Sequence, residues 1–233
     1  MTKLLYLQCG SQKHGIAKLE ERFESLGLEV DYYWAYNDHF PKSLSGYGGI
    51  FISGSPHGAY EDIPFIHRLH QLIRSAEKLQ IPMLGICFGS QILASALCGK
   101  DQVFVRPYCE VAYKPLPTTQ SAKNDLITKD LAESVSIFVW HNDEVKDSHP
   151  DMVILAYSDL CGNHIWRYGN SRVWGIQGHP EISREQALLW FEENRDRLEQ
   201  DGADIEELKR TAHDAEMGKT MLSNFAEVCL QGN

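Results

Sequence analysis

The sequence predicts an α/β fold: a mostly parallel, open β-sheet covered by helices on both faces. Up to residue 98, short strand-like runs alternate with helical runs in the order β-α-β-β-α-β-α. This alternation is typical of parallel strands joined by crossover helices. After residue 98 the chain is richer in strand-like runs separated by turn residues, so we expect some antiparallel pairing in the second half.

The expected elements are read from apolar and amphipathic runs, taken in chain order. In the first half, strands are expected at 3–8, 28–36, 46–54 and 81–86, and helices at 14–27, 63–80 and 88–98. In the second half, strands are expected at 103–108, 110–116, 136–141, 152–158, 164–169 and 172–177. The last segment is charged, helical in character and broken at Gly202. We therefore expect a domain over residues 1–182 and a helical extension over 183–233 that packs on it.

The bulk composition favours a soluble protein of the cytoplasm. The 233 residues are 43% hydrophobic and carry a formal net charge of -10. An acidic chain without a basic patch argues against nucleic acid as a partner. The N-terminal apolar stretch is too brief for a secretory signal, and we expect no membrane association.

The spacing of the cysteines gives no indication of a metal site. None of the six cysteines belongs to a Cys-x-x-Cys pair, and no histidine tract has metal-ligand spacing. Without an export signal, a disulfide framework is not expected either. We expect most of these thiols to be reduced packing residues.

Residues 81–99 contain no charged side chain and are long enough to cross a bilayer as a helix. However, a proline and two glycines within the stretch would weaken such a helix, and its polar side chains would lie in lipid. The stretch is better explained by a strand buried on both faces, a turn at Cys87 and a helix that stops at Gly99.

The motif Gly-Ile-Cys-Phe-Gly at 85–89 places Cys87 at the junction of the expected strand and helix. This is the pattern of a nucleophile elbow, a strained turn in which flanking glycines avoid clashes. At the N-terminus of a helix, the unsatisfied N–H groups and the helix dipole favour a thiolate. A buried packing cysteine would fit the same apolar run, so a nucleophile also requires a base.

We expect that base to be His179, in the motif Gly-His-Pro-Glu. Pro180 favours an extended backbone at His179, and in an extended chain residues i and i+2 project to the same side. Glu181 can therefore accept the proton of one ring nitrogen, so that the other nitrogen faces the thiol. A surface turn would explain a lone His-Pro-Glu, but not its combination with the elbow.

The motifs GICFGSQ at 85–91 and GIQGHPE at 175–181 together resemble the class I, triad-type glutamine amidotransferases. Their order and separation match the family, and the resemblance covers residues 45–182. It implies a single flavodoxin-like domain that needs no metal or organic cofactor. With SGSP at 53–56, the motifs look closest to stand-alone members related to the amidotransferase domain of GMP synthase, some of which act on γ-glutamyl peptides.

The resemblance gives roles to further residues. It implies an oxyanion hole formed by the backbone N–H groups of Ser55 and Phe88, since Pro56 has no N–H group. Many family members have glycine where Ser55 stands, and an ordinary Gly-Ser-Pro turn would give the same letters. The resemblance also implies substrate-binding roles, of which the one for Gln91 agrees with its position one helical turn after Cys87. The implied substrate-binding residues are Gly54, Gln91, His141 and Asp143.

The implied reaction is attack of Cys87 on the γ-glutamyl amide of glutamine, which gives a γ-glutamyl thioester and releases ammonia and then glutamate. The sequence contains no synthetase module, so an amidotransferase would need a separate synthetase subunit as partner. If the leaving amine is an amino acid or a peptide, the chain is instead a γ-glutamyl peptidase. Both interpretations stay open here.

Two alternative hypotheses belong to other functional classes. A non-catalytic regulatory binding protein would keep the fold without needing Cys87, His179 and Glu181, yet all three are present. A cysteine-dependent esterase of the α/β-hydrolase type usually places its acid well before the histidine, not two residues after it.

Overall fold

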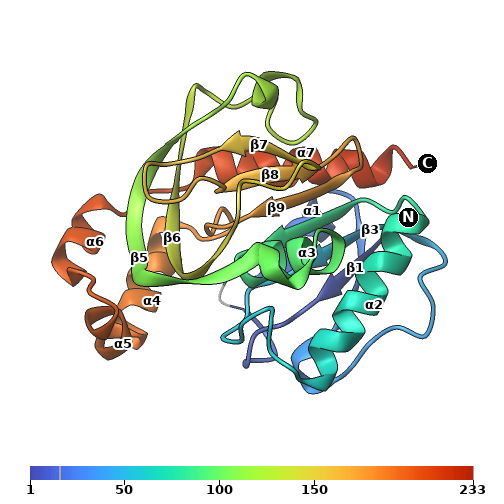
Figure 1. The fold of residues 1–233 in the computed structure, drawn as a ribbon, viewed down its shortest axis with the longest axis horizontal. Helices are drawn as coiled ribbons and strands as arrows, with labels where there is room; N and C mark the ends of the chain where they lie inside the picture. The colour runs from blue at the N-terminus through green and yellow to red at the C-terminus, as the bar shows by residue number, and fades with distance from the viewer. Residues whose placement is uncertain (16, 233) are drawn as a thin grey trace.

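The structure is a computed structural model that describes residues 1–15 and 17–232. Its main sheet has seven strands in the order β2-β1-β3-β4-β9-β8-β7 (Figure 1). Five of them run parallel, and β8 and β7 add an antiparallel edge. The expected fold class is therefore confirmed. The strand bounds are β1 (Lys3–Leu7), β2 (Glu29–Tyr33), β3 (Tyr47–Ile52), β4 (Met83–Ile86), β7 (Met152–Ala156), β8 (Ile165–Tyr168) and β9 (Val173–Ile176).

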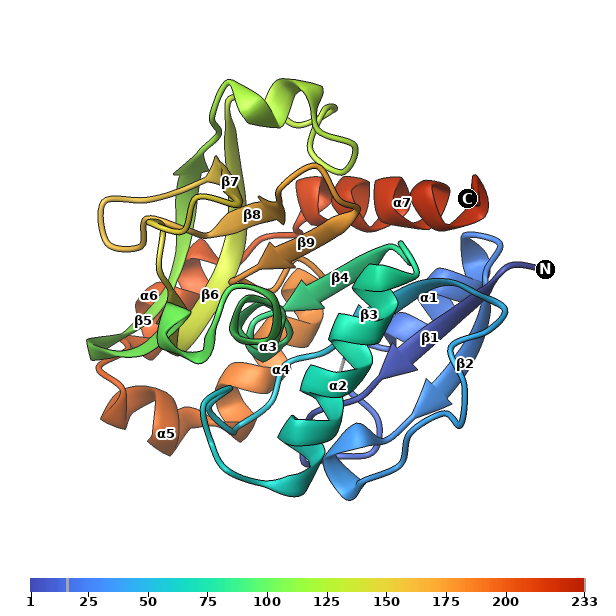
Figure 2. The same ribbon diagram turned by 45° about the vertical axis from the view of Figure 1, so that its right-hand side comes forward.

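Helices cover both faces of this sheet (Figure 2). Successive residues of a strand point to opposite faces, and so Leu4 and Leu5 of β1 belong to two different core clusters. The cluster around Leu4 includes side chains of α1 (Leu19–Ser25) and α7 (Glu216–Leu230). The cluster around Leu5 includes side chains of α2 (Pro64–Lys78) and α3 (Phe88–Leu97).

A long hairpin outside the main sheet carries a third group of helices. β5 (Val103–Pro117) pairs antiparallel with β6 (Ser134–Val145). The two short strands predicted at 103–108 and 110–116 are instead one strand, whose register shifts between Val105 and Glu110. Phe138 of β6 shares a core cluster with apolar side chains of three helices. These helices are α4 (Arg184–Glu193), α5 (Arg195–Gln200) and α6 (Ile205–Thr211), and the 3₁₀ turns are η1 (Ala35–Asn37), η2 (Lys100–Gln102) and η3 (Ser121–Asn124).

The first helix is shorter than the predicted segment 14–27. α1 begins only at Leu19, because Lys18 has a left-handed backbone conformation with φ of 45°. Residues 16 and 233, which the predicted helical segments included, lie outside the described residues. The helical character of 183–232 is observed, whereas the division of the chain at residue 182 stays a prediction.

The uncharged segment 81–99 forms a strand, a turn and a helix, as predicted. Every residue of β4 is buried, and in α3 burial continues from Phe88 to Ala96. A helix surrounded by protein on all sides needs no polar face, which explains the absence of charge. Among the described residues, no helix combines the length and the apolarity that crossing a membrane requires.

Candidate active site

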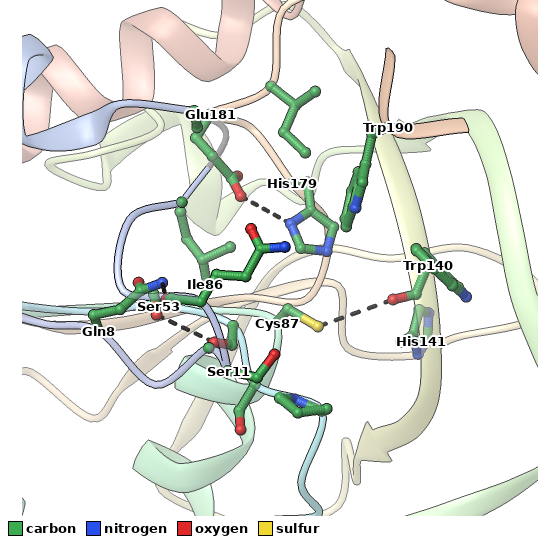
Figure 3. Close-up of a pocket in the computed structure, with 18 of the residues that line it drawn as sticks. Gln8, Ser11, Ser53, Ile86, Cys87, Trp140, His141, His179, Glu181 and Trp190 are labelled. Atoms are coloured by element: carbon green, nitrogen blue, oxygen red, sulfur yellow. Dashed lines mark hydrogen bonds and ion pairs between the residues drawn. The ribbon is translucent and has the colours of Figure 1, made fainter. Parts of the chain in front are cut away.

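The candidate site lies at the carboxyl ends of four neighbouring parallel strands. Gln8 follows β1, Ser53 follows β3, Cys87 follows β4, and Gln177 follows β9. Ligands of open parallel sheets bind at this edge. A cleft of about 360 Å³ opens there, and Figure 3 shows the side chains that line it. The motifs around Cys87 and His179 meet because β4 and β9 are adjacent strands.

Cys87 occupies a strained turn between β4 and α3. Its φ of 53° and ψ of -111° lie outside the regions that non-glycine residues normally adopt. Such a conformation costs about 1–3 kcal/mol and persists only where the surroundings enforce it. The nearby glycines allow the close packing: a Cβ at Gly85 would lie 2.2 Å from the backbone oxygen of Gly89. A Cβ at Gly89 would lie 2.1 Å from the backbone oxygen of Ile52.

We expect Gly89→Ala to destabilise the fold by about 3 kcal/mol. Alanine favours helix over glycine by about 1 kcal/mol, but here the added methyl group would overlap a backbone oxygen that no side-chain rotation can move. The clash therefore outweighs the gain in helix propensity. Urea-induced unfolding of the variant and the wild type measures the difference.

Gly15→Ala is the matched control, because a Cβ there would meet only the amide nitrogen of Gln8 at 3.9 Å. Gly15 also lines the cleft, so the two substitutions add the same group near the same site. Equal unfolding midpoints for the Gly89 and Gly15 variants would contradict the packing argument.

His179 and Glu181 lie beside Cys87. The Nδ1 atom of His179 is 2.8 Å from Oε1 of Glu181, and the Cys87 sulfur lies 3.9 Å from the carbonyl oxygen of Trp140. Because a carboxylate only accepts, Nδ1 carries the proton and Nε2 is the nitrogen that can serve the thiol. Burial by itself lowers the pKa of His179, but Glu181 and Cys87 together raise it to about 10. A cationic imidazole next to a cysteine is the arrangement that generates a thiolate nucleophile.

The position of His179 is fixed by backbone and ring contacts. Its N–H group donates to the carbonyl oxygen of Phe138 at 2.7 Å, which ties the segment after β9 to β6. The indole ring of Trp190 in α4 packs edge-on against the imidazole, with ring centroids 5.2 Å apart and an interplanar angle of 81°. Figure 3 shows Trp190 on one side of the imidazole and Glu181 on the other. The histidine therefore has little freedom to turn away from Cys87.

The residues predicted to form an oxyanion hole come from the segments that follow β3 and β4. The first hydrogen bond of α3 runs from the N–H of Gln91 to the carbonyl of Cys87 at 3.2 Å. The N–H of Phe88 therefore lies before the first hydrogen bond of the helix and has no acceptor within α3. Ser55 follows Gly54 in the cleft lining. Gly54 is close to both Cys87 and His179, since a Cβ on Gly54 would lie 3.7 Å from Cβ of Cys87 and 3.7 Å from Cε1 of His179. The role of Ser55 and Phe88 as oxyanion donors stays a prediction.

The predicted substrate-binding residues all line the cleft, and the side chains of Gln91, His141 and Asp143 make hydrogen bonds within the protein. The amide nitrogen of Gln91 donates to the carbonyl of Asp143 at 3.1 Å, which joins α3 to β6. The carboxylate of Asp143 accepts from the hydroxyl of Tyr60 at 3.4 Å. Both ring nitrogens of His141 already have partners, Nδ1 at the carbonyl of Asp143 and Nε2 at Glu110. Binding of substrate by these residues stays a prediction.

The cleft and the layer directly beneath it contain residues that the sequence analysis did not identify. Gln177 is 3.9 Å from the Cys87 sulfur, and its carbonyl oxygen accepts from the amide of Gln91 at 3.3 Å. Gln8 could have been found, because the first polar residue after each central parallel strand belongs to the ligand-binding edge. Arg197 in α5 lies over the ring of Trp140 at 5.2 Å, on a helix whose sequence gave no functional signal.

Comparison with known proteins agrees with this geometry. The model of the family described as glutamine amidotransferase class-I matches residues 9–192 of the chain. The chain belongs to this family. A glutamine amidotransferase from Methylobacillus flagellatus has the same fold, with a TM-score of 0.83 over 100% of this chain and 95% of that one, at 20% sequence identity.

This amidotransferase-family chain spans most of one curated relative and a third of another. It is 31% identical to γ-glutamyl peptidase 5 from Arabidopsis thaliana over 211 residues, which cover 88% of this chain and 83% of that protein. It is 29% identical to a glutamine-hydrolysing GMP synthase from Porphyromonas gingivalis over 182 residues, which cover 78% of this chain. The chain thus spans only 33% of that synthase.

Proposed function

We propose that this chain hydrolyses the γ-glutamyl amide of glutamine through a thioester on Cys87 and releases ammonia and glutamate. The observation that carries the proposal is the grouping of Cys87 with the hydrogen-bonded pair His179 and Glu181, with Cys87 in a strained turn at the start of α3. Membership of the class I glutamine amidotransferase family supports it. A non-catalytic binding protein would not need this arrangement, which combines strain, a buried base and its carboxylate.

In the first half-reaction, the Cys87 sulfur attacks the side-chain carbonyl carbon, and the backbone N–H groups of Ser55 and Phe88 bind the oxygen that becomes negative. His179 gives its Nε2 proton to the nitrogen of the leaving amine as the C–N bond breaks. The product that remains is a γ-glutamyl thioester. Glu181 keeps the proton on Nδ1 throughout, which leaves Nε2 for the reaction.

In the second half-reaction, the neutral His179 takes a proton from water, and the hydroxide attacks the thioester carbonyl. The C–S bond breaks, glutamate leaves, and the proton restores the imidazolium beside the sulfur. Gly54, Gln91 and Asp143 border the space in which the amino acid end of the substrate would lie. If ammonia is used for synthesis, a synthetase domain or subunit must receive it.

The cleft favours γ-glutamyl peptides as a second candidate substrate class. Beyond Cys87 and His179 it extends to Trp140, Trp190 and Arg197, which are large side chains that ammonia does not need. Trp140 is held by a hydrogen bond from its indole nitrogen to Asp201 at 2.9 Å. A leaving group with an apolar part and a carboxylate would fit two indole rings and a guanidinium group.

The test is to incubate the protein with glutamine and with a panel of γ-glutamyl dipeptides and to measure glutamate release. Glutamine turnover that rises on addition of a co-purifying protein supports the amidotransferase function. Turnover confined to dipeptides supports the peptidase function. Release of glutamate from none of these compounds, with or without the co-purifying protein, would exclude both and leave a binding role.

We expect Arg197→Gln to lower kcat/KM for a γ-glutamyl dipeptide by about tenfold, because a charge-assisted hydrogen bond to the leaving-group carboxylate is lost. The value for glutamine should not change. The matched control is Arg195→Gln on the same helix, since Arg195 pairs with Glu192 and Glu199 and does not line the cleft. Equal loss with a dipeptide and with its C-terminal amide would contradict recognition of a carboxylate.

A further inference from the structure

A buried group of metal-ligating side chains lies behind the β6 wall of the cleft. His141 of β6 and Cys161 and His164 of the loop before β8 each offer one ligand atom, and these atoms lie within 4.8 Å of one another. All three residues are buried, with exposed fractions of 3%, 0% and 0%. No step of the proposed reaction uses Cys161 or His164. The spacing rules applied to the sequence did not find this group because the fold brings β6 to a distant loop.

His141 has the orientation of a metal-bound histidine. Its Nδ1 lies 2.9 Å from the carbonyl oxygen of Asp143, which can only accept, so Nδ1 carries the proton. Nε2 then lies 3.2 Å from Oε2 of Glu110 and 3.4 Å from Nη1 of Arg106, whose guanidinium group pairs with the same carboxylate. An Nδ1–H bond to a backbone carbonyl with Nε2 on a metal is a common arrangement of ligating histidines.

The other two side chains also point to a ligand. Cys161 and His164 have the spacing Cys-x-x-His, and both side chains are fully buried. Among the residues described, none hydrogen-bonds to Nδ1 of His164, although this atom is buried. A buried nitrogen without a partner costs free energy, which a metal bond would recover.

The charges around the group suit a divalent ion. Arg106 pairs with Glu110 and with Glu144 at 3.2 Å, and Lys114 pairs with Glu110 at 2.8 Å. The two carboxylates therefore face Arg106 and Lys114, and a Cys161 that lost its proton on binding an ion would offset part of the charge of that ion. Oε2 of Glu110 lies 3.2 Å from Nε2 of His141 and 4.0 Å from Nε2 of His164, and it is itself paired with Arg106.

We propose that His141, Cys161 and His164 bind one Zn²⁺ ion that holds the β6 segment 140–143 against the loop before β8. A donor set of one thiolate and two imidazoles selects a borderline-soft ion such as zinc and disfavours magnesium and calcium. The ion would stiffen the wall that carries Trp140 and Asp143. This inference does not depend on the proposed reaction, and it gives His141 a structural role.

The test uses the full chain with Cys87→Ala, so that the cleft thiol cannot contribute a metal site. After equilibration with zinc and gel filtration, elemental analysis should find one zinc per chain. In the same background Cys161→Ser and His164→Ala should each weaken zinc binding by more than about 100-fold. Cys98→Ser is the matched control, because Cys98 is a half-buried thiol outside the group and its substitution should leave zinc binding unchanged.

Cobalt gives a readout that does not require a variant to fold as the wild type does. Co²⁺ bound to the Cys87→Ala chain should show thiolate-to-cobalt charge-transfer absorption and the visible bands of tetrahedral cobalt. Both should disappear in Cys161→Ser. Failure of the Cys87→Ala chain to retain either ion would overturn the proposal, as would a charge-transfer band that persists in Cys161→Ser.

Discussion

Cys87→Ala is expected to lower the rate of γ-glutamyl hydrolysis by about 10⁴-fold or more, which is the scale of loss when a nucleophile acting as one unit with its base is removed. Without the sulfur no thioester forms, and the remaining groups can only assist direct attack by water. Substrate should still bind, because Gln91, Asp143 and Gly54 are unchanged. Glutamate release and the affinity for glutamine measured by calorimetry separate the two effects.

Cys98→Ser is the control for this substitution as well, since Cys98 is a half-buried thiol outside the cleft lining. It should retain full turnover. A Cys87→Ala enzyme that keeps more than about a hundredth of wild-type activity would reject Cys87 as the nucleophile.

Alkylation provides an independent measure of the same thiol. Burial raises the pKa of Cys98 and of Cys109 to about 12, and Cys9, Cys161 and Cys229 are buried. These five thiols should react slowly with iodoacetamide near neutral pH, because the thiolate is the reactive form. Peptide mass mapping should therefore find the first label on Cys87.

The central part of the site could be predicted from the sequence because its signals are local. A cysteine between two glycines at a strand–helix junction predicts a strained turn, and the structure shows φ of 53° at Cys87. The pairing of His179 with Glu181 follows from the i, i+2 geometry of an extended chain, and Nδ1 is 2.8 Å from the carboxylate. That β9 lies next to β4 was not derivable from either segment alone; the motifs and the resemblance implied only that His179 lies near Cys87.

The outer part of the cleft depends on tertiary packing and escaped prediction. Trp190 and Arg197 belong to helices that looked like a charged amphipathic tail, yet packing of α4 and α5 on the hairpin brings them to the cleft. The hairpin itself was expected as shorter strands. Its continuity through the register shift near Glu110 results from pairing with β6, which the local residue pattern of 103–116 does not reveal.

Glu181→Gln is expected to lower kcat/KM by about 10³- to 10⁴-fold, because an amide no longer fixes the proton on Nδ1 of His179. It should also change the pH dependence. The carboxylate favours the charged imidazole and, with Cys87, raises the pKa of His179 to about 10 against the effect of burial, which lowers this pKa. Wild-type activity should therefore persist until the imidazolium loses its proton near pH 10.

Without the carboxylate, burial dominates and the pKa of His179 falls, so the alkaline limb of kcat/KM should move to lower pH in Glu181→Gln. Glu193→Gln removes the same charge from a cleft residue on α4 and is the matched control, for which the limb should stay in place. A shift of equal size in both variants would mean that the general field of the cleft, and not the bond from Glu181 to Nδ1, sets the protonation of His179. An unshifted limb in Glu181→Gln would show that the cysteine alone holds the imidazole in its charged form.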